Sequence, residues 1–323
     1  MSNKAAAPLL ALIAVLSWGA MFPIAAHAIP TVEPLHLTAL RYGLASVVFV
    51  ALLWRIEGRR SLRPQRTLRL WALGTIGFAG FNLLSYIGLE HTGPRNAALI
   101  VPTMPLLTAL VRWLREGIKP PAVTIGATVV ALTGVVLVIS HGDLASLAEG
   151  GVGFGSLLVL AGVFGFVLYS LGAADFPEWS PLRYTTLSAV LGTLSIFAIT
   201  EAATLAGWVH APSTGDVAAT WPELAYIVVM GALVAVLAWN AAIRAMGPQN
   251  TTLFINLVPV TAFVIAIGGG YRPGAVELAG AALTISALVG GNLLARSPGR
   301  VRVRPARLAR PARPVAAPRP GSA

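Results

Sequence analysis

The sequence predicts an all-α integral membrane protein, with ten transmembrane helices arranged as two inverted five-helix repeats. Three observations predict this class: 56% of the 323 residues are hydrophobic and only 11% charged, the apolar residues fall into helix-length runs, and one stretch recurs later in the chain. Soluble domains carry about a quarter charged residues, so a water-soluble enzyme or a nucleic-acid-binding protein does not fit. The chain has no cysteine, which excludes disulfides and thiolate metal sites.

Ten apolar segments are separated by charged clusters or by Pro/Gly pairs. Each is close to the 20 or so residues that a spanning helix needs, and none alternates like a strand of a membrane barrel. The first segment also resembles a signal peptide, because Lys4 precedes it and Ala26-His27-Ala28 ends it. Its length and its place in the repeat favour a retained span. The expected spans are 9–28, 36–54, 70–89, 96–114, 122–140, 153–173, 182–200, 224–242, 251–270 and 274–294.

The basic residues fall on one side of these spans. With the amino terminus inside, the cytoplasmic segments hold all but three of the 23 Lys and Arg residues. The outer segments hold Arg95 and Arg272, and Arg41 lies within the second span. Loops rich in Lys and Arg stay in the cytoplasm, so both termini are expected there. The excess of arginine over lysine is typical of a GC-rich bacterium, which places the protein in a bacterial inner membrane.

The segment 298–323 is rich in Pro, Ala and Arg, so we expect a disordered cytoplasmic tail. One interpretation is attraction to anionic lipid headgroups. The alternative is a solvated tail that only fixes the topology, and binding to nucleic acid is not expected.

A duplicated stretch divides the chain into halves. Residues 93–110 (GPRNAALIVPTMPLLTAL) and 247–264 (GPQNTTLFINLVPVTAFV) align without a gap at an offset of 154. Each half contains five expected spans, an odd number, so the second half would enter the membrane from the opposite side. The sequence therefore predicts repeats over 1–150 and 151–297, an architecture that suits alternating access. Identical residues recur at the offset of 154, among them Asn96/Asn250, Pro105/Pro259 and Gly126/Gly280. Two further identical pairs recur at slightly smaller offsets, Gly19/Gly165 at 146 and Pro34/Pro181 at 147.

The order and spacing of several motifs resemble the EamA family of the drug/metabolite transporter superfamily, over about residues 8–296. The motifs are Ser17-Trp18-Gly19, Arg41, 82–92 (NLLSYIGLEHT), Pro105, Tyr169, Trp239-Asn240, Gly247-Pro248 and 256–259 (NLVP). The chain departs from the Gly-Glu pair that the family often has after the fourth and ninth spans, since it reads 115–117 (REG) and 268–270 (GGG) there. The resemblance implies a small-molecule carrier, commonly an exporter of amino acids or other metabolites.

Arg41 is the charged residue expected deepest in a span. It follows Pro34 by seven residues, which is about 10 Å along a helix. A charge at that depth is expensive and therefore a candidate site. The functional interpretation is recognition of an anionic group such as a carboxylate. The structural alternative is a contact with carbonyl groups or with Glu33.

Asn82, Ser85 and Tyr86 share one helical face because they lie at i, i+3 and i+4. At the offset of 154, Ser85 and Tyr86 correspond to Trp239 and Asn240. Equivalent positions of inverted repeats converge, so these residues are expected to line a substrate pocket. The alternatives are ordinary interhelical hydrogen bonds and, for Trp239, an anchor at the membrane interface.

Further candidates occupy comparable places in the two halves. Trp18 and Tyr169 lie early in each half, and Asn256 corresponds to a proline of the first half; all three are expected to contribute to substrate binding. Prolines within spans free backbone groups and can act as hinges, although plain kinks are the alternative. The expected hinge prolines are Pro23, Pro102, Pro105 and Pro259.

The sequence carries no enzyme pattern. The five histidines are not spaced with acids as metal ligands, and no phosphate-binding loop is present. We therefore expect no catalytic residue, no metal and no cofactor, and a small-molecule solute and the bilayer as partners. The predicted function is a secondary transporter that exports a small metabolite. The alternative is a multi-span scaffold, sensor or enzyme without transport activity.

Overall fold

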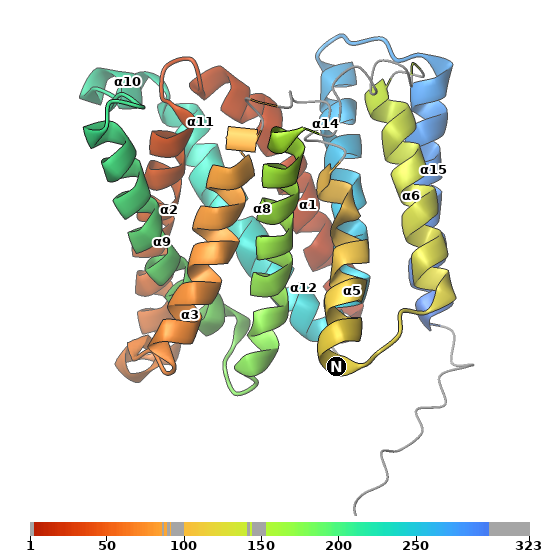
Figure 1. Ribbon diagram of the computed structural model, residues 1–323, viewed down its shortest axis with the longest axis horizontal. Coiled ribbons are helices and arrows are strands. Elements are labelled where there is room, and N and C mark those ends of the chain that lie inside the picture. The colour runs from red at the N-terminus through yellow and green to blue at the C-terminus, as the bar shows by residue number, and fades with distance from the viewer. Residues whose placement is uncertain are drawn as a thin grey trace, which may run out of the picture.

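In the computed structural model the chain forms helices that run side by side (Figure 1). The structure describes the backbone of residues 3–85, 87–88, 91, 100–140, 143 and 153–296, and this part of the chain contains no strand. The expected tail at 298–323 with its attraction to lipid, the expected boundary at 150/151 and the candidate Tyr86 lie outside the described residues.

The elements are named as in Figure 1. The α-helices are α1 (Asn3–Ala28), α2 (Pro34–Glu57), α3 (Thr67–Gly74), α5 (Met104–Glu116), α6 (Ala122–Ser140), α8 (Phe154–Gly172), α9 (Pro181–Leu205), α10 (Thr214–Ala219), α11 (Trp221–Tyr226), α12 (Ala235–Met246), α13 (Pro248–Thr252), α14 (Leu257–Gly268) and α15 (Ala275–Arg296). The 3-10 segments are η1 (Arg59–Leu62), η3 (Val101–Thr103), η4 (Ala173–Asp175) and η6 (Leu253–Asn256). Two segments are π-helical, η2 (Thr75–Gly80) and η5 (Ile227–Val234).

The helix ends follow local chemistry. Both α2 and α9 begin with proline, whose missing N–H would have no partner in a first turn. The Ser180 hydroxyl accepts the backbone N–H of Arg183 and caps α9. The helices α2, α5 and α12 stop at glycines with positive φ, a conformation that a Cβ disfavours. These glycines are Gly58, Gly117 and Gly247.

The expected spans coincide with helical structure over almost all of their described residues, so the all-α class is confirmed; the exceptions lie at span ends and are Gly153, Gly269, Gly270 and Gly274. Among the described residues, six stretches are long and apolar enough to cross a membrane: Ala6–Ala25, Pro34–Glu57, Phe154–Asp175, Pro181–Leu205, Trp221–Met246 and Pro248–Gly268. The shorter apolar helices are Ala122–Val138 and Ala275–Gly291. Ten spans stay a prediction, because the third and fourth extend into 86–99, most of which the structure does not describe.

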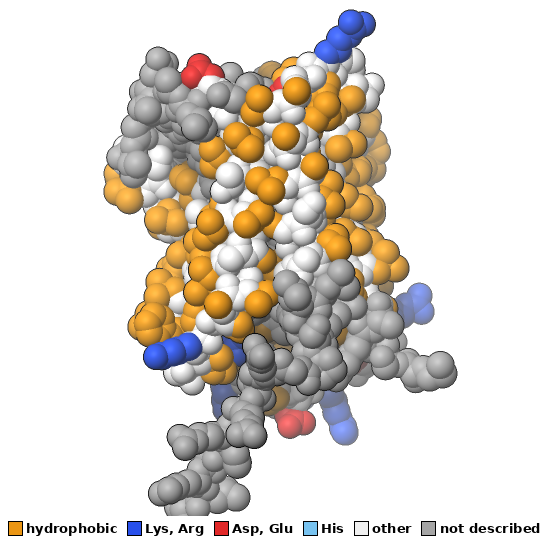
Figure 2. Space-filling view, turned by 90° about the vertical axis from the view of Figure 1, so that its right-hand side faces the viewer, with side chains coloured by type: hydrophobic (Ala, Val, Ile, Leu, Met, Phe, Trp, Pro, Cys, Tyr) orange, Lys and Arg blue, Asp and Glu red, His pale blue; other side chains and the backbone are white. Residues whose placement is uncertain are grey.

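The side of the molecule formed by α6 and α15 presents a broad apolar surface with Lys and Arg near its two ends (Figure 2). These two helices approach closely because glycines face each other. A Cβ on Gly134 would lie 2.5 Å from the carbonyl oxygen of Gly280, and a Cβ on Gly280 would lie 2.6 Å from that of Gly134. Small residues of this kind let membrane helices pack backbone to backbone.

Helices of the first half pack against helices of the second half. The contacts join α2 to α9, α1 to α12 and α14, and α8 to η2 and α5. The backbone irregularities also recur. Shifting η2 by 154 residues gives 229–234, inside η5, and shifting η3 gives 255–257, which overlaps η6. Similar departures from α-helix therefore occur at places 154 residues apart in the two halves.

Candidate functional site

Arg41 is buried inside the molecule, with 4% of its surface exposed. Its Nη2 donates to the Gly231 carbonyl oxygen at 2.9 Å, and its guanidinium carbon lies 4.8 Å from the centre of the Tyr42 ring. Its Nε is buried and has no hydrogen-bond partner. Of the two structural alternatives for Arg41, the contact with a carbonyl group is present, whereas the predicted contact with Glu33 is wrong, because Glu33 instead accepts from the exposed His210. In the described part of the chain, this permanent cation forms no ion pair with an acid.

The Gly231 carbonyl brings Arg41 and Trp18 together. Trp18 Nε1 donates to the same oxygen at 3.0 Å. Gly231 lies in the π-helical segment η5, where backbone hydrogen bonds run to i+5 instead of i+4. Local irregularity of this kind lets a helix offer a carbonyl to side-chain donors. Two candidate side chains therefore converge on one backbone atom.

A cavity of about 70 Å³ lies beside Arg41, and we call it the central cavity. Arg41 and Asn82 line it together with aromatic and aliphatic side chains, among them Trp18, Tyr42 and Phe166. Three pairs of its lining residues stand 154 positions apart, so both halves contribute equivalent places. These pairs are Asn82/Val236, Val101/Ile255 and Met104/Val258.

Asn82 is held by two contacts that fix its amide. Its Nδ2 donates to the Phe78 carbonyl oxygen at 2.7 Å and lies 3.4 Å from the Tyr42 hydroxyl. The candidates Trp18, Arg41 and Asn82 thus meet at one cavity. A guanidinium and an amide in an otherwise apolar wall suit one anionic group of a solute, although the volume of about 70 Å³ is smaller than that of common ligand pockets, which measure about 300–1,000 Å³.

A second group of candidates gathers around Asn240, which is 4% exposed. Its Nδ2 donates to the Tyr169 hydroxyl at 2.8 Å and to the Thr185 hydroxyl at 2.7 Å. The neighbouring Trp239 is fully buried and its Nε1 donates to Ser170 at 3.3 Å. The alternative of Trp239 as an interfacial anchor is therefore wrong.

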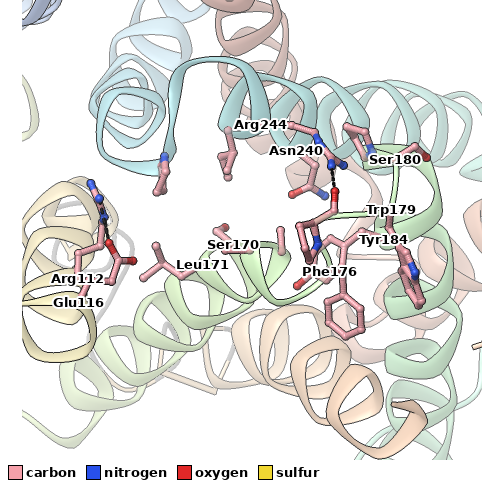
Figure 3. A pocket seen from close by; sticks show the side chains of 16 residues that line it. Arg112, Glu116, Ser170, Leu171, Phe176, Trp179, Ser180, Tyr184, Asn240 and Arg244 are labelled. Carbon is pink, nitrogen blue, oxygen red and sulfur yellow. Dashed lines mark hydrogen bonds and ion pairs between the residues drawn. The ribbon is translucent and has the colours of Figure 1, made fainter. Parts of the chain in front are cut away.

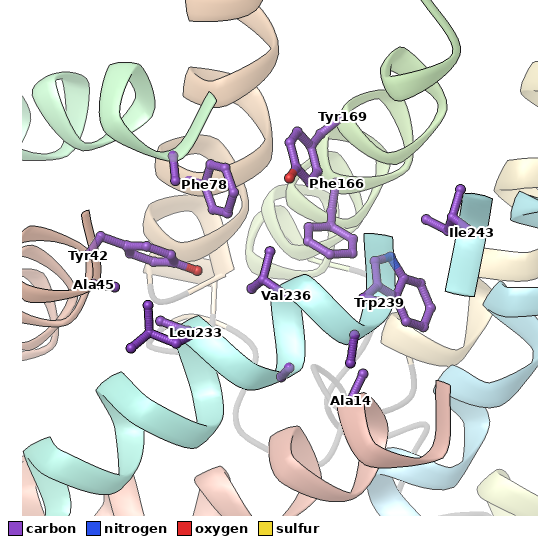
Figure 4. Close-up of a cluster of buried hydrophobic side chains, with 14 of the residues drawn as sticks. Ala14, Tyr42, Ala45, Phe78, Phe166, Tyr169, Leu233, Val236, Trp239 and Ile243 are labelled. Carbon is purple, nitrogen blue, oxygen red and sulfur yellow. The ribbon is translucent and has the colours of Figure 1, made fainter. Parts of the chain in front are cut away.

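Aromatic rings connect the two groups, and Figure 4 shows Phe166, Tyr169 and Trp239 among them. The ring centres are 5.9 Å apart for Trp18 and Phe166, 5.3 Å for Trp18 and Trp239, and 5.8 Å for Phe166 and Tyr169. These spacings are those of favourable aromatic pairs. We call Trp18, Phe166, Tyr169 and Trp239 the aromatic layer.

Two other polar candidates lie away from the central cavity. The buried Oγ of Ser85 has no hydrogen-bond partner and lies beside Gly162 of α8. Asn256 is buried, and its Nδ2 donates to the Leu253 carbonyl oxygen at 3.0 Å. Its Oδ1 has no hydrogen-bond partner. Neither residue is among those that line the central cavity.

The expected hinge prolines lie at changes of helix type or inside a helix. Pro102 is in η3, and Pro105 and Pro259 lie in the first turns of α5 and α14, where a missing N–H removes no helix bond. Pro23 lies inside α1. The Pro105 carbonyl accepts from Gln249 Nε2 at 3.1 Å. A hinge function stays a prediction for all four.

Sequence reasoning missed three parts of this arrangement. Tyr42 follows Arg41 directly, and Phe166 lies next to the Gly165 that pairs with Gly19, so adjacency to known candidates could have found both. The Gly231 carbonyl is a backbone group in a π-helical turn. The sequence signal that could have pointed to Gly231 is that it follows Gly77 by 154 residues, the offset of the duplication.

Comparison with known proteins decides the family. The profile of the EamA-like transporter family matches residues 5–140 and again residues 153–292. The chain belongs to the EamA-like transporter family. This EamA chain is 32% identical over 291 residues to the uncharacterized transporter YrdR of Bacillus subtilis, covering 88% of this chain and 90% of YrdR. It is 29% identical over 284 residues to the uncharacterized transporter YyaM of the same organism, covering 87% and 91%.

Two more distant similarities are consistent with this family assignment. The EamA chain is 24% identical over 262 residues to the uncharacterized inner membrane transporter YedA of Escherichia coli, covering 78% of this chain and 79% of YedA. A solved crystal structure with 21% identity shares the fold with a TM-score of 0.73, covering 91% of this chain and 98% of that one. The EamA protein is thus a multi-pass membrane transporter, and the enzyme alternative is excluded.

Proposed function

We propose that this EamA protein is a secondary transporter that exports a small metabolite with an anionic group, such as an amino acid or related compound. The observation that carries the proposal is Arg41, a buried cation with an unpaired Nε at the wall of an apolar cavity. A buried charge is costly unless it is paired. A carboxylate of the solute would supply the missing partner, with Trp18 and Asn82 beside it.

Alternating access between two inverted five-helix repeats, 1–150 and 151–297, is the proposed mechanism. The helix contacts between halves support it, as do the cavity-lining pairs at an offset of 154. In such a fold the two bundles rock about a site that both of them line. The ten spans and the hinge prolines belong to this proposal.

One end of the molecule carries Arg63, Arg69, Arg115 and Arg183, and we call it the arginine-rich end. The proposed orientation puts this end in the cytoplasm of a bacterium. Residues from separate elements meet at this end: Asp175 pairs with Arg69 at 2.5 Å and with Arg115 at 3.5 Å, and Arg183 donates to the Arg63 carbonyl at 3.2 Å. Basic segments of this kind stay inside. The tail at 298–323 would then face anionic lipid, at about 1 kcal/mol per basic residue near the surface.

The test starts from cells, because the solute is unknown. External metabolites are compared between cells with and without the protein, and each compound that changes is assayed by counterflow in proteoliposomes. We expect at least one anionic metabolite to accumulate outside and to exchange through the purified protein. No difference outside cells, together with no flux for a broad panel of amino acids and other metabolites, would contradict the transport function.

A further inference from the structure

We propose that a second cavity, at the arginine-rich end, is a separate binding site for an organic anion that carries a hydrogen-bond donor. The solute would rest there before it passes to Arg41. The inference rests on the proposed transport function for the identity of the solute, but the site itself can be tested without transport.

The cavity has a volume of about 440 Å³ and lies between the ends of α5, α8, α9 and α12 (Figure 3). Ligand pockets in proteins commonly measure about 300–1,000 Å³. Its charged lining residues are Arg112, Glu116 and Arg244, and its polar ones include Ser170 and Asn240. We call it the inner cavity.

The inner cavity carries one uncompensated positive charge. Arg112 Nε donates to Glu116 Oε2 at 3.0 Å, one helical turn away, so these two charges cancel. Arg244 donates instead to the carbonyl oxygen of Pro177 and forms no ion pair with an acid in the described part of the chain. A planar guanidinium with free donors is suited to a carboxylate.

Asn240 offers an acceptor one turn away from that charge. Asn240 and Arg244 stand at i and i+4 on α12, and Figure 3 shows both extending from this helix toward the cavity. The amide nitrogen of Asn240 is used by Tyr169 and Thr185, whereas its oxygen is buried and has no partner. A buried acceptor without a donor is unfavourable, so a solute N–H or O–H placed there would be stabilised.

The aromatic layer separates the inner cavity from the central cavity. Trp18 and Phe166 line the central cavity, while Trp239 donates to Ser170 in the wall of the inner cavity. Trp18 and Trp239 are in ring contact at 5.3 Å. Each cavity thus has its own arginine and its own buried amide, Arg41 with Asn82 and Arg244 with Asn240. A solute would have to displace the rings to move between them.

The first test measures access and charge with single cysteines, since the natural chain has none. Ala173 is partly exposed and lines the inner cavity, so Ala173→Cys reports on it; Gln65→Cys, exposed at the same end, is the reference. The anionic reagent sulfonatoethyl methanethiosulfonate is expected to modify Ala173→Cys faster than the cationic trimethylammonium-ethyl reagent. Adding Arg244→Gln should abolish this preference at Ala173→Cys but leave the modification rates of Gln65→Cys by both reagents unchanged.

The second test measures binding by protection of Ala173→Cys. Three probes share a phenyl ring: mandelate has a carboxylate and a hydroxyl, phenylacetate lacks the hydroxyl, and 2-phenylethylammonium is a cation. For a probe that binds, the labelling rate should fall about threefold when the free probe concentration is twice the dissociation constant, because one third of the sites are then unoccupied. Mandelate is expected to protect at concentrations about three- to tenfold lower than phenylacetate, because only its hydroxyl can donate to Asn240. The cation should not protect.

Two variants separate the two sites. Asn240→Leu should remove the advantage of mandelate, and Arg244→Gln, at the exposed rim, gives a second test if Asn240→Leu does not fold. Arg41→Gln should leave the protection of Ala173→Cys intact while it lowers transport. Protection that disappears with Arg41→Gln, equal protection by the cation, or no labelling of Ala173→Cys in folded protein would each overturn the inner site. Failure of wild-type counterflow would contradict the transport function and not this site.

Discussion

Ser46 and Thr193 contact each other through their hydroxyl oxygens, 3.0 Å apart, in the buried contact between α2 and α9. The two positions differ by 147, the same offset that pairs Pro34 with Pro181 at the starts of these helices. Equivalent positions of two related copies meet each other on the axis that relates them. The α2–α9 contact is therefore where the axis between the two proposed repeats would pass.

A cross-link on this axis should permit transport. In the cysteine-free chain, Ser46→Cys with Thr193→Cys is expected to form a disulfide on oxidation, because the two oxygens already lie within bonding reach. In alternating access by inverted repeats each repeat takes up the conformation of the other, so the distance between equivalent positions stays the same and the oxidised protein should keep most of its counterflow. Mass under non-reducing conditions measures the cross-link, and counterflow measures transport.

A cross-link away from the axis provides the control. Arg69 on α3 and Asp175 in η4 form an ion pair between the two halves at the arginine-rich end. Arg69→Cys with Asp175→Cys, joined by a short bismaleimide, should stop transport because that end has to open. Reversible loss of counterflow on oxidation of the Ser46/Thr193 pair would contradict an exchange of conformations between the two repeats.

Gly77 and Gly231, 154 positions apart, should respond differently to alanine. A Cβ on Gly77 would lie 2.4 Å from Tyr169 Cβ, which the backbone of α8 fixes, whereas a Cβ on Gly231 would lie 2.8 Å from the mobile sulfur of Met21. Overpacking costs about 1–3 kcal/mol when the neighbour cannot move. Gly77→Ala should therefore lower the thermal midpoint in detergent clearly more than Gly231→Ala does.

Gly126→Ala is the matched control for this pair, because nothing lies within 4 Å of a Cβ at Gly126. Its midpoint should stay at or above that of the natural protein. Equal losses for Gly77→Ala and Gly231→Ala would show that Met21 does not yield, and the packing argument would then be wrong.

Hydrophobic runs and proline or glycine boundaries were sufficient to predict most helix limits to within a few residues, and the expected span 122–140 is identical to α6. Side-chain direction was less predictable. Asn82 and Ser85 are three residues apart, which leaves about 60° between them around a helix. That angle is enough for Ser85 to face Gly162 while Asn82 faces the central cavity.

The acceptor for Arg41 could not be predicted from side-chain types. The Gly231 carbonyl is available where η5 adopts a π-helical turn, a property of backbone geometry. The inner cavity was missed for a related reason. Its wall combines residues from α5, α8, α9 and α12, and only their packing shows that Arg244 and Asn240 share one space.

Labelling from the two sides should fix the orientation. Gln65 and Ala211 are both exposed outside the helices, in segments that we assign to opposite sides of the membrane. An impermeant thiol reagent added to intact cells should modify Ala211→Cys and leave Gln65→Cys unmodified until the membrane is opened, because basic segments stay inside. The reverse pattern would invert the topology.

Replacing Arg41 is the most direct test of the central cavity. Arg41→Gln removes the charge that would bind the solute carboxylate, and charge-assisted hydrogen bonds contribute about 1.5–3 kcal/mol, so counterflow should fall about 10- to 100-fold. Arg41→Lys should keep part of the counterflow, because an ammonium has the positive charge but not the planar donors of a guanidinium. Arg272→Gln, at an exposed position, should behave like the natural protein.

The thermal midpoint separates this effect from misfolding. Arg41 is buried with an unpaired Nε, so a neutral amide there should leave the folded protein as stable or more stable. Low flux with an unchanged midpoint is therefore expected for Arg41→Gln. Normal flux in Arg41→Gln would mean that the guanidinium serves only to bind the Gly231 carbonyl, and the central cavity would then not be the place where the anion is recognised.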